Sequence, residues 1–195
     1  AWHSNVGQRA IGNASAHIQR SPWQPAFPER LCLMLERNDD ADCTLTNIAV
    51  PGTISAWGLE NVRSVLPTHP SLCIIAFGMN DGFYKTPPAT YAQNISMQMQ
   101  RIREVSPECE FVLVATMWGN PNRAESGIEL YEDYRDALAT LCGEGRALAD
   151  LTTPWKEFLA RKRPISLYTN GLNHPGDWGH ALYAQTIYQA ITTEG

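Results

Sequence analysis

Four short apolar runs, each followed by a segment with helical spacing, constrain the fold of this chain more than any other feature. They cover residues 45–50, 72–77, 111–116 and 146–150. A strand that reads as a continuous apolar run, without alternation, is buried on both faces of its sheet. Buried strands that alternate with helices form right-handed crossovers and a parallel sheet covered by helices on both sides. The pattern therefore predicts an α/β fold whose chemistry lies outside the carboxyl ends of the strands.

The segments between these runs carry apolar residues at helical spacing. Two such stripes are Tyr91, Ile95, Met99 and Ile102, and then Tyr131, Tyr134, Leu138 and Leu141. Both are typical of core packing, and further helices are expected over 25–37, 54–65 and 178–191. The stretch 1–22 is rich in Ser, Asn, Gln and Gly and has no apolar run. We interpret it as a loop.

Length and charge narrow the class of protein. A chain of 195 residues predicts one domain, covering residues 1–195. A net charge of −5 argues against a nucleic-acid partner. No apolar run approaches the ~18 residues of a membrane span, so no membrane partner is expected. The N-terminal residues lack the apolar core of a signal peptide, so we expect any export signal to have been removed.

The five cysteines exclude one kind of fold and leave their own pairing open. They are Cys32, Cys43, Cys73, Cys109 and Cys142. Because their number is odd and no two of them form a C-x-x-C pair, a zinc ribbon and a closed disulfide framework are excluded. Cys73 lies within an apolar run and is expected to be a buried thiol. The other four have the option of pairing, which the sequence does not decide.

Polar and glycine residues follow the predicted strands at three places. Gly52 follows the first run and is preceded by Asn47, and Gly78-Met79-Asn80-Asp81 follows the second. Near the C-terminus, Asn173-His174-Pro175 is followed by Gly179-His180 at the start of the last helix. In this order the three pieces resemble the second, third and fifth sequence blocks of the SGNH (GDSL-type) hydrolase family. The resemblance covers about residues 23–191.

This resemblance implies a role for three residues. The backbone N–H of Gly52 and the side-chain amide of Asn80 would form the oxyanion hole of an ester hydrolase. Such donors stabilise the negative charge that develops on the carbonyl oxygen during attack. His174 would be the general base, because an imidazole accepts a serine proton near neutral pH and returns it to the leaving alcohol. No cofactor is expected.

A metal site made of His174, Asp177 and His180 is a competing interpretation. It is disfavoured because Pro175 and Gly176 keep His174 off the helix that carries His180. We expect His180 to pack or cap, and Asp177 to favour the positive N-terminal end of that helix.

The sequence departs from the family pattern in two ways. The family places an aspartate three residues before the catalytic histidine, and Gly171 stands there instead. The group that orients His174 is therefore unassigned; a backbone carbonyl, the amide of Asn170 or Asn173, or a distant carboxylate are the options. The G-D-S block with the nucleophilic serine is also not recognisable. Gly12-Asn13-Ala14-Ser15 is its nearest counterpart, which makes Ser15 the candidate nucleophile within the chain.

The missing block leads to a prediction about the sheet. The resemblance implies a three-layer αβα, flavodoxin-like fold with strand order 2-1-3-4-5, and the four runs match positions two to five. An empty slot between the first two runs would leave buried N–H and C=O groups unpaired. We therefore expect the slot to be filled from outside this chain, by an upstream segment or a companion chain carrying the serine. The chain would then be the C-terminal part of a larger polypeptide.

The function that these residues and the resemblance favour is a serine esterase that removes short acyl groups, above all acetyl, from a carbohydrate. Trp118 follows the third predicted strand and Trp57 follows the Gly52 turn. Both would offer ring faces to a sugar, although covering helices is their other role. The alternatives are an acyltransferase or thioesterase of the family, or a carbohydrate-binding relic without catalysis. The family resemblance favours a secreted or periplasmic location.

Overall fold

A parallel five-stranded sheet forms the centre of the computed structural model, which describes residues 2–6, 25–122, 127–164, 167–168 and 173–193. The strands are β1 (Trp2–Val6), β2 (Leu45–Asn47), β3 (Leu72–Ala76), β4 (Glu110–Ala115) and β5 (Arg146–Asp150). Their order is β2-β1-β3-β4-β5, and all four neighbouring pairs are parallel. The predicted α/β fold with strand order 2-1-3-4-5 is confirmed.

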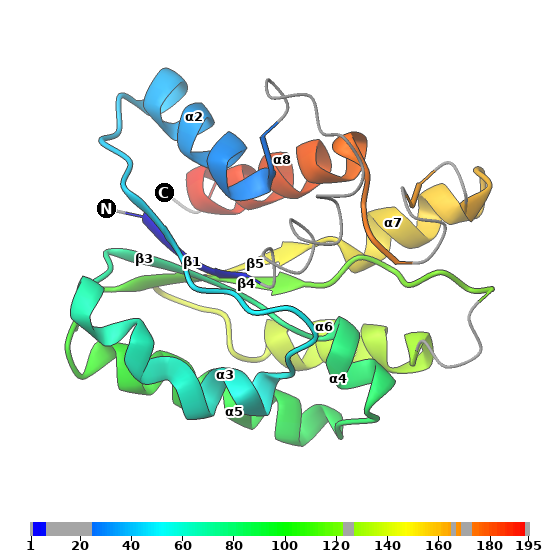
Figure 1. The fold of residues 1–195 in the computed structure, drawn as a ribbon, viewed down its shortest axis with the longest axis horizontal. Coiled ribbons are helices and arrows are strands. Elements are labelled where there is room, and N and C mark those ends of the chain that lie inside the picture. The colour runs from blue at the N-terminus through cyan, green and yellow to red at the C-terminus, as the bar shows by residue number, and fades with distance from the viewer. Residues whose placement is uncertain (1, 7–24, 123–126, 165–166, 169–172, 194–195) are drawn as a thin grey trace.

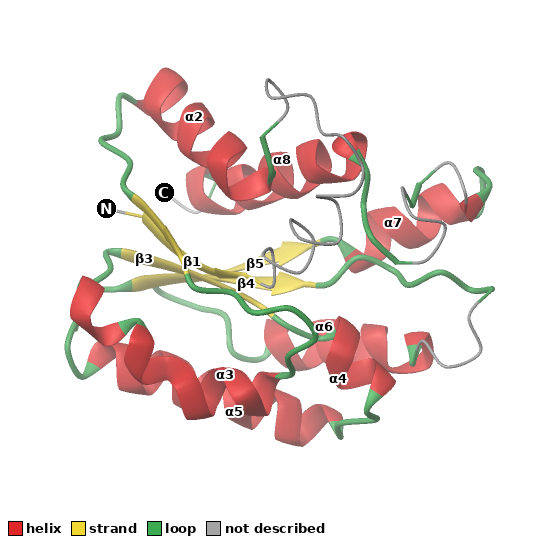
Figure 2. Cartoon of the chain, viewed as in Figure 1, coloured by secondary structure: helices red, strands yellow, loops and turns green. Residues whose placement is uncertain are grey.

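Helices cover both faces of the sheet. They are α2 (Phe27–Asp39), α3 (Ser55–Asn61), α4 (Met79–Phe83), α5 (Pro88–Arg103), α6 (Tyr131–Ala139), α7 (Thr152–Leu159) and α8 (Asp177–Thr192), with 3-10 turns η1 (Val62–Ser64), η2 (Leu66–Thr68) and η3 (Ile128–Leu130). Helices α2, α7 and α8 lie on one side of the sheet and α3, α4, α5 and α6 on the other (Figures 1 and 2). This is the predicted three-layer arrangement.

Side chains of the central strands alternate between two cores. In β3, Leu72 and Ile74 pack with α2 and α8, whereas Cys73 and Ile75 pack with α5 and α6. All four are buried, because successive side chains of a strand point to opposite faces and both faces are covered here. Continuous apolar runs in the sequence arise from this double burial.

The structure corrects the prediction for the first strand. The slot between β2 and β3 is filled by Trp2–Val6 of this chain, and neither an upstream segment nor a companion chain supplies it. Trp2 pairs with Leu45 on one side and with Leu72 on the other. The interpretation of 1–22 as a loop is therefore wrong for residues 2–6, and residues 7–22 lie outside the described part. The slot needs a strand to pair the backbone groups of β2 and β3, and almost any residue type supplies the backbone groups for that pairing.

The boundary of β2 also differs from the prediction over 45–50. The strand ends at Asn47, whose side-chain oxygen accepts a hydrogen bond from the Ala49 N–H at 3.1 Å. Asparagine commonly replaces a backbone acceptor in this way and turns the chain. The chain therefore leaves the ladder with β1 at Asn47, and residues 48–54 connect it to α3.

Two cysteines form a disulfide. Cys32 of α2 is bonded to Cys43, in the segment before β2. Cys73 and Cys109 are buried free thiols, and burial raises the pKa of Cys109 to about 12. Such thiols are unreactive at neutral pH. The expectation of a buried thiol at Cys73 is confirmed.

None of the helices in the described ranges is long and apolar enough to cross a membrane.

Candidate active site

The turns after β2 and β3 lie together at the carboxyl edge of the sheet. Gly52, in the first turn, has a φ of +72°, a left-handed conformation that favours glycine. Asn80, in the first turn of α4, donates a hydrogen bond from its side-chain amide to the Thr53 carbonyl at 3.0 Å. The structure thus places the Asn80 amide beside the residue that follows Gly52. An amide nitrogen carries two N–H groups, so one remains to bind a substrate oxygen.

A buried carboxylate holds these two turns together. Asp81 accepts hydrogen bonds from the Ser55 N–H at 3.1 Å, from the Ser55 hydroxyl at 2.6 Å and from the Gly78 N–H at 3.1 Å. Both Asp81 and Ser55 are fully buried. Burial raises the pKa of the Asp81 carboxyl, and the hydrogen bonds from Ser55 and Gly78 lower it in part. Asp81 therefore fixes the start of α3 against the start of α4.

Two side chains of α5 stabilise the contact between Ser55 and Asp81 by binding to Ser55. The Asn94 amide donates to the Ser55 hydroxyl at 3.0 Å, and the Gln98 amide donates to the Ser55 carbonyl at 3.2 Å. Both side chains are buried. The sequence analysis gave Asp81 no role of its own and did not identify Ser55, Asn94 or Gln98. Their partners lie far away in the sequence, so no local pattern could have identified them.

His174 lies just before α8, where the chain returns to the same edge. It is partly buried, and its neighbour Pro175 forms an antiparallel bridge with Tyr168. The Tyr168 hydroxyl donates to the Trp118 carbonyl at 2.7 Å, which links this loop to the segment after β4. A Cβ on Gly179 would lie 2.5 Å from the Pro175 Cβ, so only glycine lets α8 pack against the loop. This contact explains the H-P-x-x-x-G spacing physically.

The second histidine of this block has a packing role. His180 is buried within α8, and its ring stacks on that of Phe27 with centroids 6.3 Å apart. Asp177 is the first residue of α8 and is exposed, as expected for a carboxylate at a helix N-terminus. In the described ranges no three His, Cys, Asp or Glu side chains are grouped to hold a metal ion. His174, Asp177 and His180 therefore do not form a metal site in this structure.

One of the candidates for the group that orients the His174 ring can be excluded. The side-chain oxygen of Asn173 is buried and accepts no hydrogen bond within the described chain, so it does not hold the His174 ring. Asn170, Gly171 and the serine candidate Ser15 lie outside the described residues.

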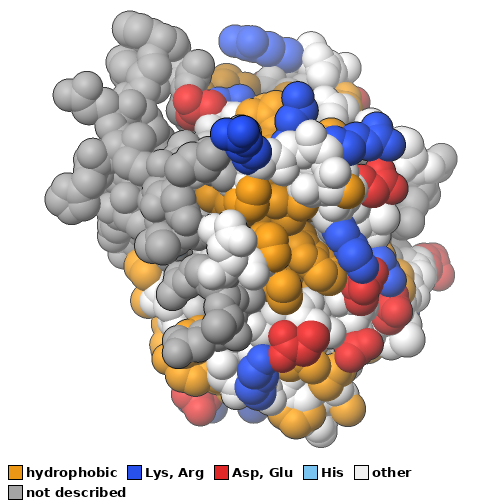
Figure 3. Space-filling model, turned by 90° about the vertical axis from the view of Figure 1, so that its right-hand side faces the viewer, with side chains coloured by type: hydrophobic (Ala, Val, Ile, Leu, Met, Phe, Trp, Pro, Cys, Tyr) orange, Lys and Arg blue, Asp and Glu red, His pale blue; other side chains and the backbone are white. Residues whose placement is uncertain are grey.

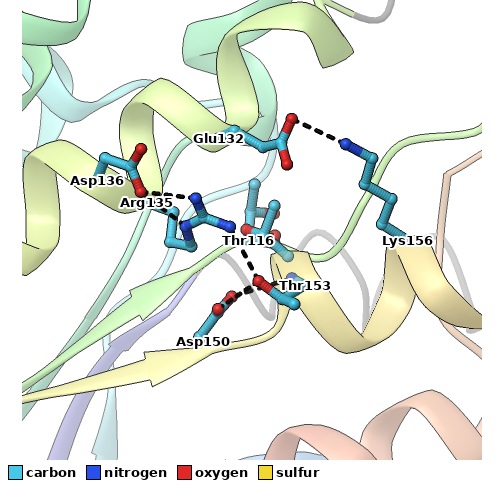
Figure 4. A network of polar contacts seen from close by, with 8 residues as sticks. Thr116, Glu132, Arg135, Asp136, Asp150, Thr153 and Lys156 are labelled. Carbon is cyan, nitrogen blue, oxygen red and sulfur yellow. Dashed lines mark hydrogen bonds and ion pairs between the residues drawn. The ribbon is translucent and has the colours of Figure 1, made fainter.

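A charged network at the same edge joins α6 to α7 (Figure 4). Arg135 donates to the Thr153 hydroxyl at 2.9 Å, and this hydroxyl donates to Asp150, at the end of β5, at 2.6 Å. Lys156 pairs with Glu132 at 2.8 Å. These contacts fix the rim of the sheet on the β5 side. They were not predicted, because nothing in their spacing marks them.

Trp57 and Trp118, the two tryptophans considered above for binding a sugar, are both partly buried. The Lys156 ammonium lies 4.7 Å from the centre of the Trp118 ring, a cation–π contact, and Tyr131 meets this ring edge-on. Trp57 lies within α3, where its carbonyl accepts a hydrogen bond from Asn61. One face of Trp118 is thus occupied by Lys156. Figure 3 looks onto the carboxyl edge, where hydrophobic side chains gather at the centre and charged ones lie above, below and to the right of them.

A parallel αβα sheet with an amide, a left-handed glycine and a histidine loop at its carboxyl edge defines the SGNH type of hydrolase. The family model for GDSL-like lipases and acylhydrolases matches residues 12–182, so the chain belongs to the GDSL-like lipase/acylhydrolase family. It is a carboxylic ester hydrolase by family.

Solved structures share this fold at low sequence identity. The crystal structure of TesA is 19% identical, with 99% of each chain covered and a TM-score of 0.71. Axe2, an acetylxylan esterase from Geobacillus stearothermophilus, is 12% identical, with 98% of this chain and 92% of that chain covered and a TM-score of 0.75. The psychrotrophic esterase EstA from Pseudoalteromonas sp. is 15% identical, with 98% and 97% covered and a TM-score of 0.66. A search of curated protein sequences found no match.

Proposed function

We propose that the chain is a serine esterase that removes acetyl or similarly short acyl groups from a carbohydrate. The observation that carries this proposal is the hydrogen bond from Asn80 to Thr53, which puts an amide donor next to the Gly52 turn. Two preorganised N–H donors at one edge suit the oxyanion of acyl transfer. The family match supports ester hydrolysis, and the acetylxylan esterase among the similar folds supports a sugar ester.

In this mechanism a serine hydroxyl attacks the ester carbonyl while His174 takes its proton. The Gly52 N–H and the Asn80 amide stabilise the oxyanion, and His174 then returns the proton to the leaving sugar hydroxyl. Water repeats the sequence on the acyl-enzyme. With β1 supplied by Trp2–Val6, we assign the nucleophile to Ser15, the serine of the G-N-A-S sequence that follows β1. This assignment replaces the serine expected from outside the chain.

The Cys32–Cys43 disulfide bears on where the enzyme works. Disulfides persist in oxidising compartments and are rare in the reducing cytosol. We therefore propose a secreted or periplasmic location, where acylated polysaccharides are accessible.

Labelling with a serine-reactive phosphonate, followed by peptide mapping, tests the nucleophile directly. We expect one labelled peptide that contains Ser15, together with turnover of nitrophenyl acetate. His174→Asn should abolish both reactions. His69→Asn is the matched control, because His69 is an exposed histidine just before β3, at the opposite edge of the sheet.

Each other outcome contradicts a definite part of the proposal. A label found on another serine would refute only the assignment of Ser15 as the nucleophile. Activity retained in His174→Asn would refute the general base. Neither labelling nor turnover in the unmodified protein would support the carbohydrate-binding relic. Acyl transfer to an added alcohol in place of water would identify an acyltransferase.

A further inference from the structure

An exposed pair of aromatic side chains lies next to the candidate oxyanion hole. Phe83 is 44% exposed and Tyr84 is 64% exposed, whereas most aromatic side chains in the described ranges are buried. Their rings meet edge to face, with centroids 5.1 Å apart and an interplanar angle of 85°. Leaving a Phe side chain in water forgoes a large part of the free energy that its burial provides. Large apolar groups exposed together commonly mark a binding surface.

The pair shares a helix face with Asn80. Phe83 and Tyr84 follow Asn80 by three and four positions, the spacing that places residues on one side of a helix. The Tyr84 N–H also donates to the Asn80 carbonyl at 2.9 Å. Helix α4 lies at the carboxyl end of the sheet (Figure 1). A group bound on these rings would therefore sit within about one helical turn, ~5 Å along the axis, of the Asn80 amide.

The turn that carries these rings is held at several points. The Thr86 N–H donates to the Asp81 carbonyl at 2.9 Å, and the Tyr134 hydroxyl donates to the Thr86 carbonyl at 2.6 Å. Lys85 forms an ion pair with Glu129. Behind the pair, Gly82 packs so tightly that an added Cβ would lie 2.5 Å from the Tyr131 ring. A fixed turn holds the rings outward, which lowers the entropy that binding would cost.

We propose that Phe83 and Tyr84 form a platform that binds the sugar ring of the substrate, on the leaving-group side of the ester. This inference rests on the proposed function and adds residues that position its substrate. A sugar has an apolar C–H face that stacks on an aromatic ring and a polar rim that needs hydrogen-bonding groups nearby. The Tyr84 hydroxyl and the exposed Lys85–Glu129 pair offer such groups. A long acyl chain instead needs an enclosed apolar channel, and two perpendicular, exposed rings do not form one.

Two esters of the same acid test the platform. One is acetylated xylo-oligosaccharide, and the other is ethyl acetate, which carries no ring. We expect Phe83→Ala and Tyr84→Ala each to lower kcat/KM for the sugar ester about tenfold more than for ethyl acetate. Tyr84→Trp, which keeps a ring face, should retain most of the discrimination. Leu33→Ala removes another exposed apolar side chain, on α2, and should change neither reaction.

Direct binding separates failure of the platform from failure of the proposed function. Calorimetric titration with unacetylated xylohexaose should show binding to the unmodified protein and at least a tenfold weaker affinity in the Phe83→Ala/Tyr84→Ala double variant. This readout needs no turnover, so it stands even if neither ester is hydrolysed. An equal loss of kcat/KM for the two esters would overturn the platform. So would a double variant that binds xylohexaose as tightly as the unmodified protein does. Hydrolysis of ethyl acetate alone by the unmodified protein would overturn it as well.

Discussion

Replacing Asp81 by asparagine should weaken the hydrogen-bonded contact between the two turns that carry Gly52 and Asn80. The side chain keeps its shape but loses one of its two acceptor oxygens. Three donor groups now point at this carboxylate, two from Ser55 and one from Gly78. Whichever way the new amide is oriented, its NH₂ group faces a buried donor.

The size of the effect follows from these contacts. A buried donor left without an acceptor costs about 1–3 kcal/mol. Asparagine also removes the cost of keeping a charge buried, which offsets part of this loss. The net loss in the free energy of unfolding should be about 1–2 kcal/mol, a fall in Tm of roughly 2–8 °C for a chain of this size. Because the turn bearing Asn80 loosens, kcat for acetyl ester hydrolysis should fall roughly 10- to 100-fold with little change in KM.

Urea unfolding and steady-state kinetics measure the two effects on the same variant. Asp136→Asn is the matched control, since Asp136 is an exposed carboxylate on α6 that pairs with Arg135. It should change the free energy of unfolding by less than about 0.5 kcal/mol. If Asp81→Asn were as stable and as active as this control, the carboxylate would not be what holds the turns.

Measurements at acid pH add an independent check, because burial raises the pKa of the Asp81 carboxyl in the folded state above its ordinary value. A folded carboxyl with a raised pKa binds its proton more tightly than the unfolded one, so it contributes stability below the unfolded pKa. This contribution is lost as the pH rises through the folded pKa. The difference in free energy of unfolding between the unmodified protein and Asp81→Asn should therefore be larger below pH ~3.8 than at pH 7. A difference that grew with pH would contradict the direction of the shift.

Three further predictions follow from single contacts. Asn80→Ala should lower kcat about 100- to 1000-fold with KM nearly unchanged, and a change below about threefold would remove Asn80 from the mechanism. Gly179→Ala forces a Cβ to within 2.5 Å of Pro175, so it should lower Tm and activity together; an unchanged Tm in a melting experiment would show that the loop yields freely. Removing the disulfide with Cys32→Ser/Cys43→Ser should cost about 2–3 kcal/mol in urea unfolding. A reducing agent should destabilise the unmodified protein by the same amount and leave this double variant unaffected.

Burial on both faces explains why most of the sheet was predictable and β1 was not. Strands such as β3 show their burial as continuous apolar runs, with Leu72 and Ile74 on one core and Cys73 and Ile75 on the other. The residues of Trp2–Val6 hold their place through backbone pairing with both neighbours. Backbone donors and acceptors are the same for every residue except proline, so no side-chain pattern reports them. The slot is filled, as predicted, but by Trp2–Val6 and not by an upstream segment or a companion chain.

The residues of the candidate site likewise divide into those that the sequence predicted and those that it did not. Gly52, Asn80 and His174 stand out because they follow recognisable elements in a fixed order. Asp81 takes its main partner, Ser55, from another element, and that contact exists only once α3 and α4 have packed. The exposure of Phe83 and Tyr84 is likewise a property of the folded surface, which no local sequence pattern reports. Helix α4 has only five residues, too few to show a helical period.

The position of β1 also dictates an order of events during synthesis. Trp2 is made before both of its partners, Leu45 and Leu72, which emerge from the ribosome later. This interior strand must therefore wait, unpaired, until both neighbours, β2 and β3, exist. Pairing across such sequence distances is slow, and waiting strands are open to association with other chains. Polar residues in Trp2–Val6 keep the waiting strand compatible with water, which an apolar run in the same place would not do.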